Sequence, residues 1–182
     1  HEVGIITGSD MDYVEQQCSV IYDLSSVQPS KIHFLPCNGT KYYLNDDEVY
    51  SLNMRKWFIP YKWNNLIKFL LKCQMEMIEK YDLPLTGHFI NYRESLINWC
   101  PIGRNATTED RKSFEWKNHL LGTEVIRTEY LKRLNDFFLF TDMNIKAKLG
   151  GDTSFDIFPD GWDKSYPIEK GILKDYTIHF VG

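Results

Sequence analysis

The chain has 182 residues, of which 43% are hydrophobic and 25% are charged, as expected for one globular domain or two small ones. The formal net charge of −4 argues against a general nucleic-acid or anionic-membrane surface, although it allows a local basic pocket for an anionic ligand. No run approaches about 18 apolar residues, and the first residues do not resemble a signal peptide. We therefore expect a soluble protein with no nucleic-acid or membrane partner.

The cysteines indicate neither a zinc site nor a disulfide framework, because they are scattered without Cys-x-x-Cys spacing or paired histidines. Free thiols are typical of a reducing compartment, so we expect the protein to be cytoplasmic. We assign no metal ligand within the chain. The four cysteines are Cys18, Cys37, Cys73 and Cys100.

The N-terminal part has the pattern of α/β structure. Val3–Thr7 is an apolar, β-branched run, which predicts a strand buried on both faces. Gly8 follows, and Ser9 or Asp10 can cap a helix near residues 11–18. A strand, a Gly-Ser turn and a helix N-terminus together favour a bound phosphate, but the same turn occurs in many α/β folds without a ligand.

Further strands are expected within residues 32–52 and at the C-terminal end of the chain. The Asn38-Gly39 pair is a strong hairpin signal. Because compact domains rarely begin or end on a core strand, we expect the chain to carry only part of its α/β core. The expected strands are Ile32–Leu35, Tyr42–Leu44, Val49–Leu52 and Tyr176–Gly182.

Helical periodicity and strand alternation follow each other in the middle of the chain. The apolar spacing predicts helices over Trp63–Ile78 and Glu124–Phe138, the second capped by Thr123. Thr107 and Asp110 fit a capping box for a short helix that would carry Arg111. The predicted strands are a hairpin over His88–Cys100 with its turn at Glu94-Ser95, then Asn144–Leu149 and Thr153–Phe158.

This order predicts an α+β module inserted into an α/β core. We place the partial core at residues 1–53 and 161–182 and the inserted module at residues 54–160. An antiparallel sheet backed by helices is the economical packing for the module.

Three arginines of the module are candidate ligands for a phosphate. Arg93, Arg104 and Arg111 lie at a strand end, in a loop and at a helix start, so they can converge. The planar guanidinium suits phosphate oxygens. Alternatively, they are surface residues paired with neighbouring carboxylates such as Glu109 and Asp110.

The last predicted strand of the module carries two more candidates. Residues 153–158 alternate strictly, so Ser154 and Asp156 share one face. A Pro-Asp-Gly turn follows and places Lys164 just past the strand end, where loop residues often act in binding or catalysis. The alternative is an ordinary strand with a hydrated polar face.

Three stretches in this order resemble the eukaryotic-type α-phosphomannomutases of the haloacid dehalogenase superfamily. The longest has the pattern G-G-x-x-S-F-D-I-F-P-D-G-W-D-K and is highly specific. The stretches are Gly150–Lys164, Ile5–Asp10, and Tyr92-Arg93 with Pro101–Arg104 and Arg111.

The resemblance implies a partial haloacid dehalogenase-like core with an inserted α+β cap. It implies that the intact protein interconverts mannose 6-phosphate and mannose 1-phosphate through an aspartyl-phosphate, with Mg²⁺ and a hexose 1,6-bisphosphate activator. It also implies a hexose phosphate substrate and a homodimer formed through the cap. Lys164 and Ser9 would contact the transferring phosphoryl group. The residues implied to hold the distal phosphate and the sugar hydroxyls are Arg93, Arg104, Arg111, Ser154 and Asp156.

The chain also departs from the family pattern. The family's Asp-x-Asp-Gly-Thr nucleophile strand would precede His1, and its Mg²⁺-binding loop would follow Gly182, so we expect this chain alone to be inactive and the Mg²⁺ ligands to lie outside it. Cys37 stands where the family usually has Glu, and Glu94-Ser95 where it has Asn-Gly, so these turns are expected to differ locally. Two alternatives stay open: a sugar phosphatase of the same superfamily, or a non-catalytic binding or dimerisation module.

Overall fold

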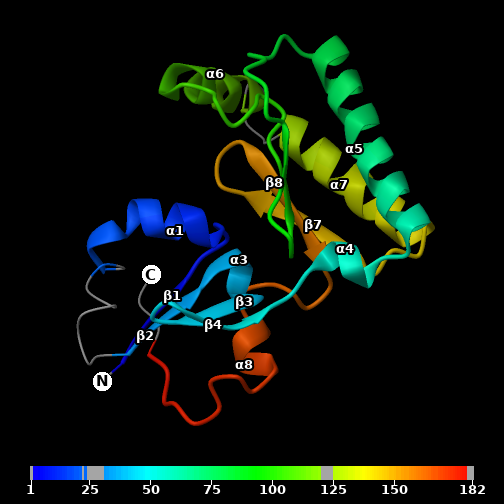
Figure 1. Cartoon of the computed structure of the whole chain (residues 1–182). Helices are drawn as coiled ribbons and strands as arrows, with labels where there is room; N and C mark the ends of the chain where they lie inside the picture. The colour runs from blue at the N-terminus through cyan, green and yellow to red at the C-terminus, as the bar shows by residue number, and fades with distance from the viewer. Residues whose placement is uncertain (1, 22, 24–30, 120–124, 180–182) are drawn as a thin grey trace. The chain divides into compact units, whose positions relative to one another are not determined.

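The computed structural model describes residues 2–21, 23, 31–119 and 125–179. The chain divides into two units, which are considered separately (Figure 1). The core unit comprises His1–Leu52 and Gly161–Gly182, and the cap unit comprises Asn53–Asp160. That the two units are separate domains with the expected boundaries stays a prediction.

The core unit is built on a four-stranded sheet in the order β1-β2-β3-β4. β1 (Val3–Ile6) pairs in parallel with β2 (Ile32–Leu35). β3 (Lys41–Leu44) and β4 (Asp47–Ser51) continue the sheet in antiparallel pairing. A parallel pair followed by antiparallel strands is the mixed α/β arrangement that the sequence predicts for this part of the chain.

The helix after β1 begins where the capping residues predict. α1 (Met11–Gln17) has Asp10 as its N-cap, whose Oδ1 accepts a hydrogen bond from the backbone N–H of Tyr13 at 3.1 Å. Val14 packs with Phe34 of β2 in a buried apolar cluster. The cap therefore fixes where α1 starts, and the apolar face fixes how it lies on the sheet.

The connection from β2 to β3 is wider than the expected tight hairpin turn. It forms a short helical turn, α3 (Pro36–Gly39), in which three consecutive residues from Cys37 have positive φ angles of 51°, 62° and 77°. The backbone N–H groups of Cys37 and Asn38 donate to the carbonyls of Ser9 and Thr7, each at 2.7 Å. Asn and Gly tolerate this left-handed backbone best, which explains their place here.

Two predictions for the core unit are wrong. β1 is not buried on both faces, since Val3 is 58% exposed. Among the described strands β1 pairs only with β2, so it is an edge strand of the sheet that the structure describes. Residues 176–179 form no strand, and 180–182 lie outside the described residues. A strand needs a hydrogen-bonded neighbour, and no described ladder includes residues 176–179. α8 (Tyr166–Glu169) precedes them.

The cap unit holds a second four-stranded sheet in the order β5-β6-β8-β7. All three pairings are antiparallel, which confirms the antiparallel sheet predicted for this module. Its strands are β5 (Ile90–Tyr92), β6 (Ile97–Trp99), β7 (Ile145–Gly150) and β8 (Ser154–Pro159).

Two long helices, α5 (Pro60–Lys80) and α7 (Val125–Phe140), cover one face of this sheet and run side by side (Figure 1). The rings of Phe69 and Phe137, one from each helix, stack at 3.8 Å between centroids. Trp99 of β6 donates its indole N–H to Gln74 at 2.7 Å and lies edge-on to Tyr130.

None of the helices among the described residues is long and apolar enough to cross a membrane. The cap-unit helices are α4 (Met54–Trp57), α5 (Pro60–Lys80), α6 (Thr108–Asn118) and α7 (Val125–Phe140).

The two long helices confirm their predicted positions, with one correction. Leu71 is part of the apolar spacing that predicts α5, yet it is 52% exposed. Cys73 and Gln74 lie in the buried face instead, and the Gln74 amide is satisfied there because it also donates to the carbonyl of Pro101 at 2.9 Å. The expected cap of α7, Thr123, lies outside the described residues.

Candidate functional site

β8 divides its side chains between two environments, as its alternation predicts. Phe155 and Ile157 pair with residues of β6 on the helix-covered face, and Phe155 stacks on Trp99 at 4.9 Å. Ser154 and Asp156 lie on the other face, and Asp156 stands directly opposite Asn98 of β6. The hydroxyl and the carboxylate therefore do share one face, on the side of the sheet away from α5 and α7.

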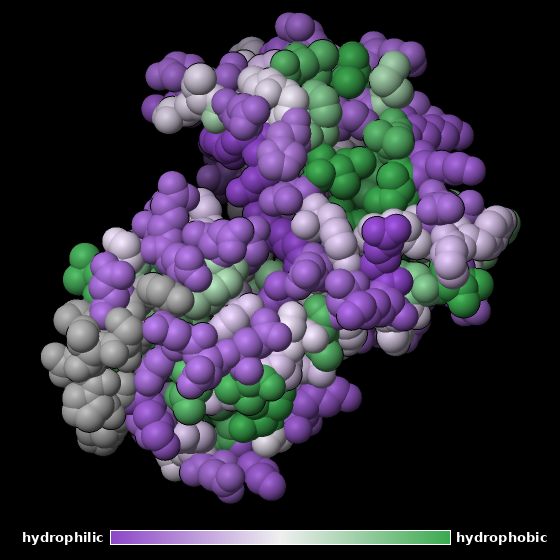
Figure 2. Space-filling model, in the orientation of Figure 1, coloured by the Kyte–Doolittle hydropathy of each residue, from purple (hydrophilic) through white to green (hydrophobic). Residues whose placement is uncertain are grey.

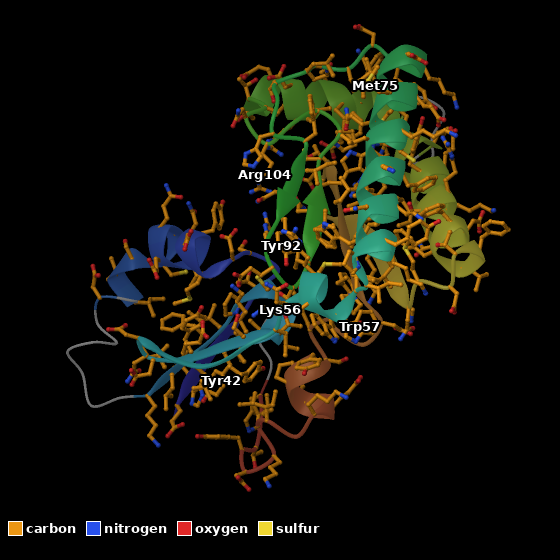
Figure 3. All side chains as sticks on the ribbon, turned by 45° about the vertical axis from the view of Figure 1, so that its right-hand side comes forward. Tyr42, Lys56, Trp57, Met75, Tyr92 and Arg104 are labelled. Atoms are coloured by element: carbon orange, nitrogen blue, oxygen red, sulfur yellow. The ribbon has the colours of Figure 1, made fainter. Side chains whose placement is uncertain are left out.

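A hydrogen-bond network on that face joins three of the predicted site residues. Arg104 Nη1 donates to Asn98 Oδ1 at 2.9 Å. Asn98 Nδ2 donates to Ser154 Oγ at 3.0 Å and to Asp156 Oδ1 at 2.7 Å. Figure 3 shows Arg104 on the side of β5 and β6 away from α5. The network thus places a guanidinium, a hydroxyl and a carboxylate next to one another.

The neighbouring strand leaves room for the Asp156 carboxylate. A Cβ atom on Gly150 would lie 2.8 Å from the carboxyl carbon and from one carboxylate oxygen of Asp156. Ser154, which pairs with Gly150 in the ladder, donates its hydroxyl hydrogen to the Gly150 carbonyl. Any side chain at the first glycine of the sequence motif would therefore force the Asp156 carboxylate to move.

Arg111 lies beside Arg104 but makes different contacts. It donates from Nη2 to the Arg104 carbonyl at 3.2 Å and from Nη1 to the Thr153 hydroxyl at 2.9 Å. Asp110 does not pair with it but completes the predicted capping box of α6 with Thr107. Arg111 therefore fastens the loop after β6 to the turn before β8 and makes these contacts instead of the alternative surface pair with Asp110.

Arg93 lies at the other end of the hairpin. It follows β5 directly, and its backbone N–H donates to the Leu96 carbonyl at 2.8 Å across the turn. The side chain is 8% exposed, and Glu94 in the turn has a φ of 63°. Of the three arginines, Arg104 and Arg111 therefore lie side by side. Arg93 lies at the opposite end of the hairpin, near the β5–β6 turn.

Ser9 and Lys164 belong to the core unit. Ser9 is half-buried, its N–H donates to Thr7 Oγ1 at 3.2 Å, and its carbonyl accepts from Cys37 in α3. Lys164 is exposed, has no ion-pair partner within the described residues, and lines a cavity of about 560 Å³ together with Ile5 of β1. Ser9 is not among the described residues that line this cavity. Among the described contacts, none therefore links Ser9 to Lys164.

Mg²⁺ does not fit the residues that the structure describes. Hard divalent cations take several oxygen ligands, usually including carboxylates. No group of three or more His, Cys, Asp or Glu side chains in the described parts of the chain is arranged to hold a metal ion. The described residues therefore do not form a site for this ion.

Two residues of the site are absent from the sequence-based predictions. Asn98 links Arg104 to β8. In the sequence it stands out only as a polar residue between the apolar Ile97 and Trp99. Arg127 of α7 is 3% exposed and donates from Nη2 to the carbonyls of Gly151 at 2.6 Å and Ser154 at 3.2 Å. It clamps the turn that leads into β8, a role that helix periodicity does not reveal.

The whole chain, residues 1–182, matches the family model described as eukaryotic phosphomannomutase. The chain belongs to this family. It is 33% identical over 184 residues to a phosphomannomutase of Spinacia oleracea, covering 99% of this chain and 67% of that relative. It is 35% identical over 187 residues to one of Saccharomyces cerevisiae, covering 99% and 66%. The chain thus spans about two thirds of the length of these curated relatives.

Solved structures show the fold. Plasmodium falciparum IMP-nucleotidase superposes with a TM-score of 0.58 at 12% identity, over 97% of this chain and 48% of the other. The C-terminal domain of the Candida albicans trehalose synthase regulatory protein gives a TM-score of 0.51 at 13% identity, over 93% and 48%. At these identities the likeness concerns the fold alone. The mixed α/β class that the sequence predicts is confirmed.

Proposed function

We propose that the whole protein that carries this chain is a phosphomannomutase. It interconverts mannose 6-phosphate and mannose 1-phosphate, a step in GDP-mannose biosynthesis, through an aspartyl-phosphate. The observation that carries this proposal is the network in which Arg104, Ser154 and Asp156 meet at Asn98, on positions that match the family motif. A guanidinium beside a hydroxyl and a carboxylate suits a phosphorylated sugar, because it offers a cation for phosphate and partners for hydroxyl groups.

The cap-unit residues are assigned to the part of the hexose phosphate that does not react. Arg104 binds the distal phosphate, while Ser154 and Asp156 accept hydrogen bonds from sugar hydroxyls. Arg93 and Arg111 add positive charge to the same unit, and the contacts of Arg111 also hold the Arg104 loop in place. Binding energy gained on this distant part of the substrate holds it for reaction.

The core-unit residues are assigned to the phosphoryl group that is transferred. The ammonium of Lys164 stabilises the negative charge on the equatorial phosphoryl oxygens, and Ser9 donates a hydrogen bond to one of them. The bond from phosphorus to the sugar oxygen breaks as the bond to the first aspartate of the family's Asp-x-Asp-Gly-Thr strand forms, and the second aspartate gives the sugar oxygen a proton. The phosphoryl group then returns to the hydroxyl group at the other end of the sugar. Mg²⁺ and a hexose 1,6-bisphosphate activator belong to this proposal, the bisphosphate supplying the phosphoryl group that primes the aspartate.

Phosphorus-31 NMR of the whole protein with mannose 1-phosphate, Mg²⁺ and glucose 1,6-bisphosphate tests the proposal. The mannose 6-phosphate signal should grow as that of mannose 1-phosphate falls. Release of free mannose and inorganic phosphate would identify a sugar phosphatase instead, and no turnover with retained binding would identify a non-catalytic module. Lys164→Met should abolish turnover, whereas the exposed Lys174→Met in the same unit should leave it unchanged.

We also propose that the protein forms a homodimer through the cap unit and works in the cytoplasm. Leu71 and Met75, four residues apart on α5, are 52% and 56% exposed. Figure 2 shows hydrophobic side chains gathered over α5, and Figure 3 places Met75 on its outer surface. An exposed apolar helix face is typical of an association surface. The four free cysteines support a reducing compartment.

A charge placed on this helix face tests the dimer. Met75→Asp should raise the dimer dissociation constant by about tenfold or more, because the carboxylate would lose its water on association. Sedimentation velocity over a range of concentrations measures this. The exposed Glu115→Ala on α6, outside this helix face, serves as the control. A wild-type protein that stays monomeric at high concentration would refute the dimer.

A further inference from the structure

Asn98 occupies the centre of the cap-unit site. Its side chain is 3% exposed, so it is held by protein groups rather than by water. Its oxygen accepts from Arg104 at 2.9 Å, and its nitrogen donates to Ser154 at 3.0 Å and to Asp156 at 2.7 Å. One buried amide therefore contacts all three residues that form the described network.

The polarity of these partners fixes the orientation of the amide. A guanidinium can only donate hydrogen bonds, and an ionised carboxylate can only accept them. The amide oxygen must therefore face Arg104 and the amide nitrogen must face Asp156. A flipped amide would set donor against donor and acceptor against acceptor, which a buried site does not tolerate.

We propose that Asn98 is a positioning residue for recognition of the hexose phosphate. Its amide holds Arg104 and Asp156 in the arrangement in which they receive the distal phosphate and the sugar hydroxyls, without contacting the substrate itself. This inference rests on the proposed function. It adds a buried residue of β6 whose single polar group sets the geometry of ligand-binding residues on two other segments.

Two nearly isosteric substitutions test the role of the amide in the whole protein. Asn98→Leu removes all three hydrogen bonds and should raise the KM for mannose 1-phosphate about tenfold or more, with a smaller change in kcat, because the lost contacts serve binding of the distant part of the substrate. Asn98→Asp at neutral pH should do the same, because it places a second carboxylate against Asp156.

The pH dependence of the second variant separates positioning from general damage. The charged groups around position 98 are Arg104, Asp156 and Lys148, which stands opposite Asp156 on β7. Two facing carboxylates take up a shared proton readily, and a protonated carboxyl group at position 98 again offers one donor and one acceptor. The KM of Asn98→Asp relative to wild type should therefore recover as the pH falls, whereas that of Asn98→Leu should not.

Asn91→Leu is the matched control. Asn91 stands opposite Asn98 in the ladder on β5, and the same substitution there should change KM by less than about threefold. Circular dichroism checks that each variant is folded. An active wild type whose KM is unaffected by Asn98→Leu, or an Asn98→Asp variant with no acid recovery, would overturn the role of Asn98. A wild type without mutase activity would instead overturn the proposed function, and the role of Asn98 with it.

Discussion

The cap unit and the core unit hold their predicted site residues in different ways. In the cap unit, Arg104, Ser154 and Asp156 are joined through side chains to one buried residue, Asn98. In the core unit, Ser9 is held through its backbone by Thr7 and α3, and Lys164 is exposed. The cap-unit geometry follows from strand register, whereas the core-unit geometry follows from turns.

The cap-unit sheet is also more tightly packed than the core-unit sheet. Trp99 and Phe155 at the centre of the cap-unit sheet are fully buried, whereas β1 and β4 of the core unit carry mostly exposed or half-buried residues. A sheet with a fully buried centre under two long helices fixes the side chains on its open face more firmly than a sheet whose edge strands carry exposed or half-buried residues. The cap unit is therefore the more preorganised part of the described chain.

The largest expected effect tests this difference in packing. Trp99→Ala should lower the free energy of unfolding of the cap unit by about 3 to 5 kcal/mol, because it removes a buried ring and its hydrogen bond to Gln74. Val3→Ala in β1 should cost less than about 1 kcal/mol, because Val3 is largely exposed. Urea denaturation followed by fluorescence and circular dichroism measures both. Equal losses would contradict the comparison.

A pair of adjacent glycines tests whether the cap-unit site is preorganised. Gly150→Ala should weaken hexose phosphate binding about tenfold or more, because its Cβ would meet the Asp156 carboxylate. Gly151→Ala, with a φ of 53° and open space around a Cβ, should cost about 1 kcal/mol of stability and leave affinity nearly unchanged. Calorimetric titration and thermal melting separate the two effects. The same affinity for both variants would show that the position of Asp156 does not matter.

Acid pH should destabilise both units through different carboxylates. The hydrogen bond from Lys80 lowers the pKa of Glu129 in the cap unit, and that from His33 lowers the pKa of Glu2 in the core unit. Because each folded-state pKa lies below the unfolded value, the stabilisation is present above the unfolded pKa and is lost as the pH falls through the folded pKa. Glu129→Gln should reduce the acid loss by less than about 1 kcal/mol, because the pair is largely exposed.

Unfolding curves between about pH 7 and about pH 3 would measure these slopes. Glu2→Gln should flatten only the transition of the core unit, and Glu129→Gln only that of the cap unit. A variant that leaves the slope of its own unit unchanged would show that its ion pair contributes nothing to stability.

The smallest expected effect concerns the cysteines. Burial raises the pKa of the Cys73 thiol in α5 to about 11, so little thiolate is available at neutral pH. Cys18 in the core unit is half-buried. Iodoacetamide should therefore modify Cys18 well before Cys73, as measured by peptide mass spectrometry. Faster modification of Cys73 would mean that the cap unit opens more readily than the core unit.

Local patterns in the sequence predicted much of the fold and part of the site. The alternation around Asp156 places it correctly with Ser154 on one face, and the spacing of Thr107 and Asp110 predicts the capping box of α6. Both depend only on neighbouring residues. Such features are set by backbone geometry and side-chain chemistry over a few positions, so the sequence alone is sufficient for them.

Features that depend on partners distant in the sequence were missed. The role of Asn98 depends on its hydrogen bond to Asp156, which is 58 positions away. Arg127 can be buried because carbonyls at the start of β8 and in the turn before it accept its hydrogen bonds. Residues 176–179 have strand-like composition but no described neighbour to pair with. Periodicity cannot supply these long-range partners, because it reports only which way a side chain points.

The central claim is that the cap unit recognises the hexose phosphate through the network around Asn98. The most direct measurement is amide chemical-shift mapping of the 182-residue chain during a titration with mannose 1-phosphate. We expect saturable shifts centred on Asn98, Arg104 and Ser154, including the Asn98 side-chain amide. Titration to saturation with no shift on β6, β8 or the Arg104 loop would contradict it.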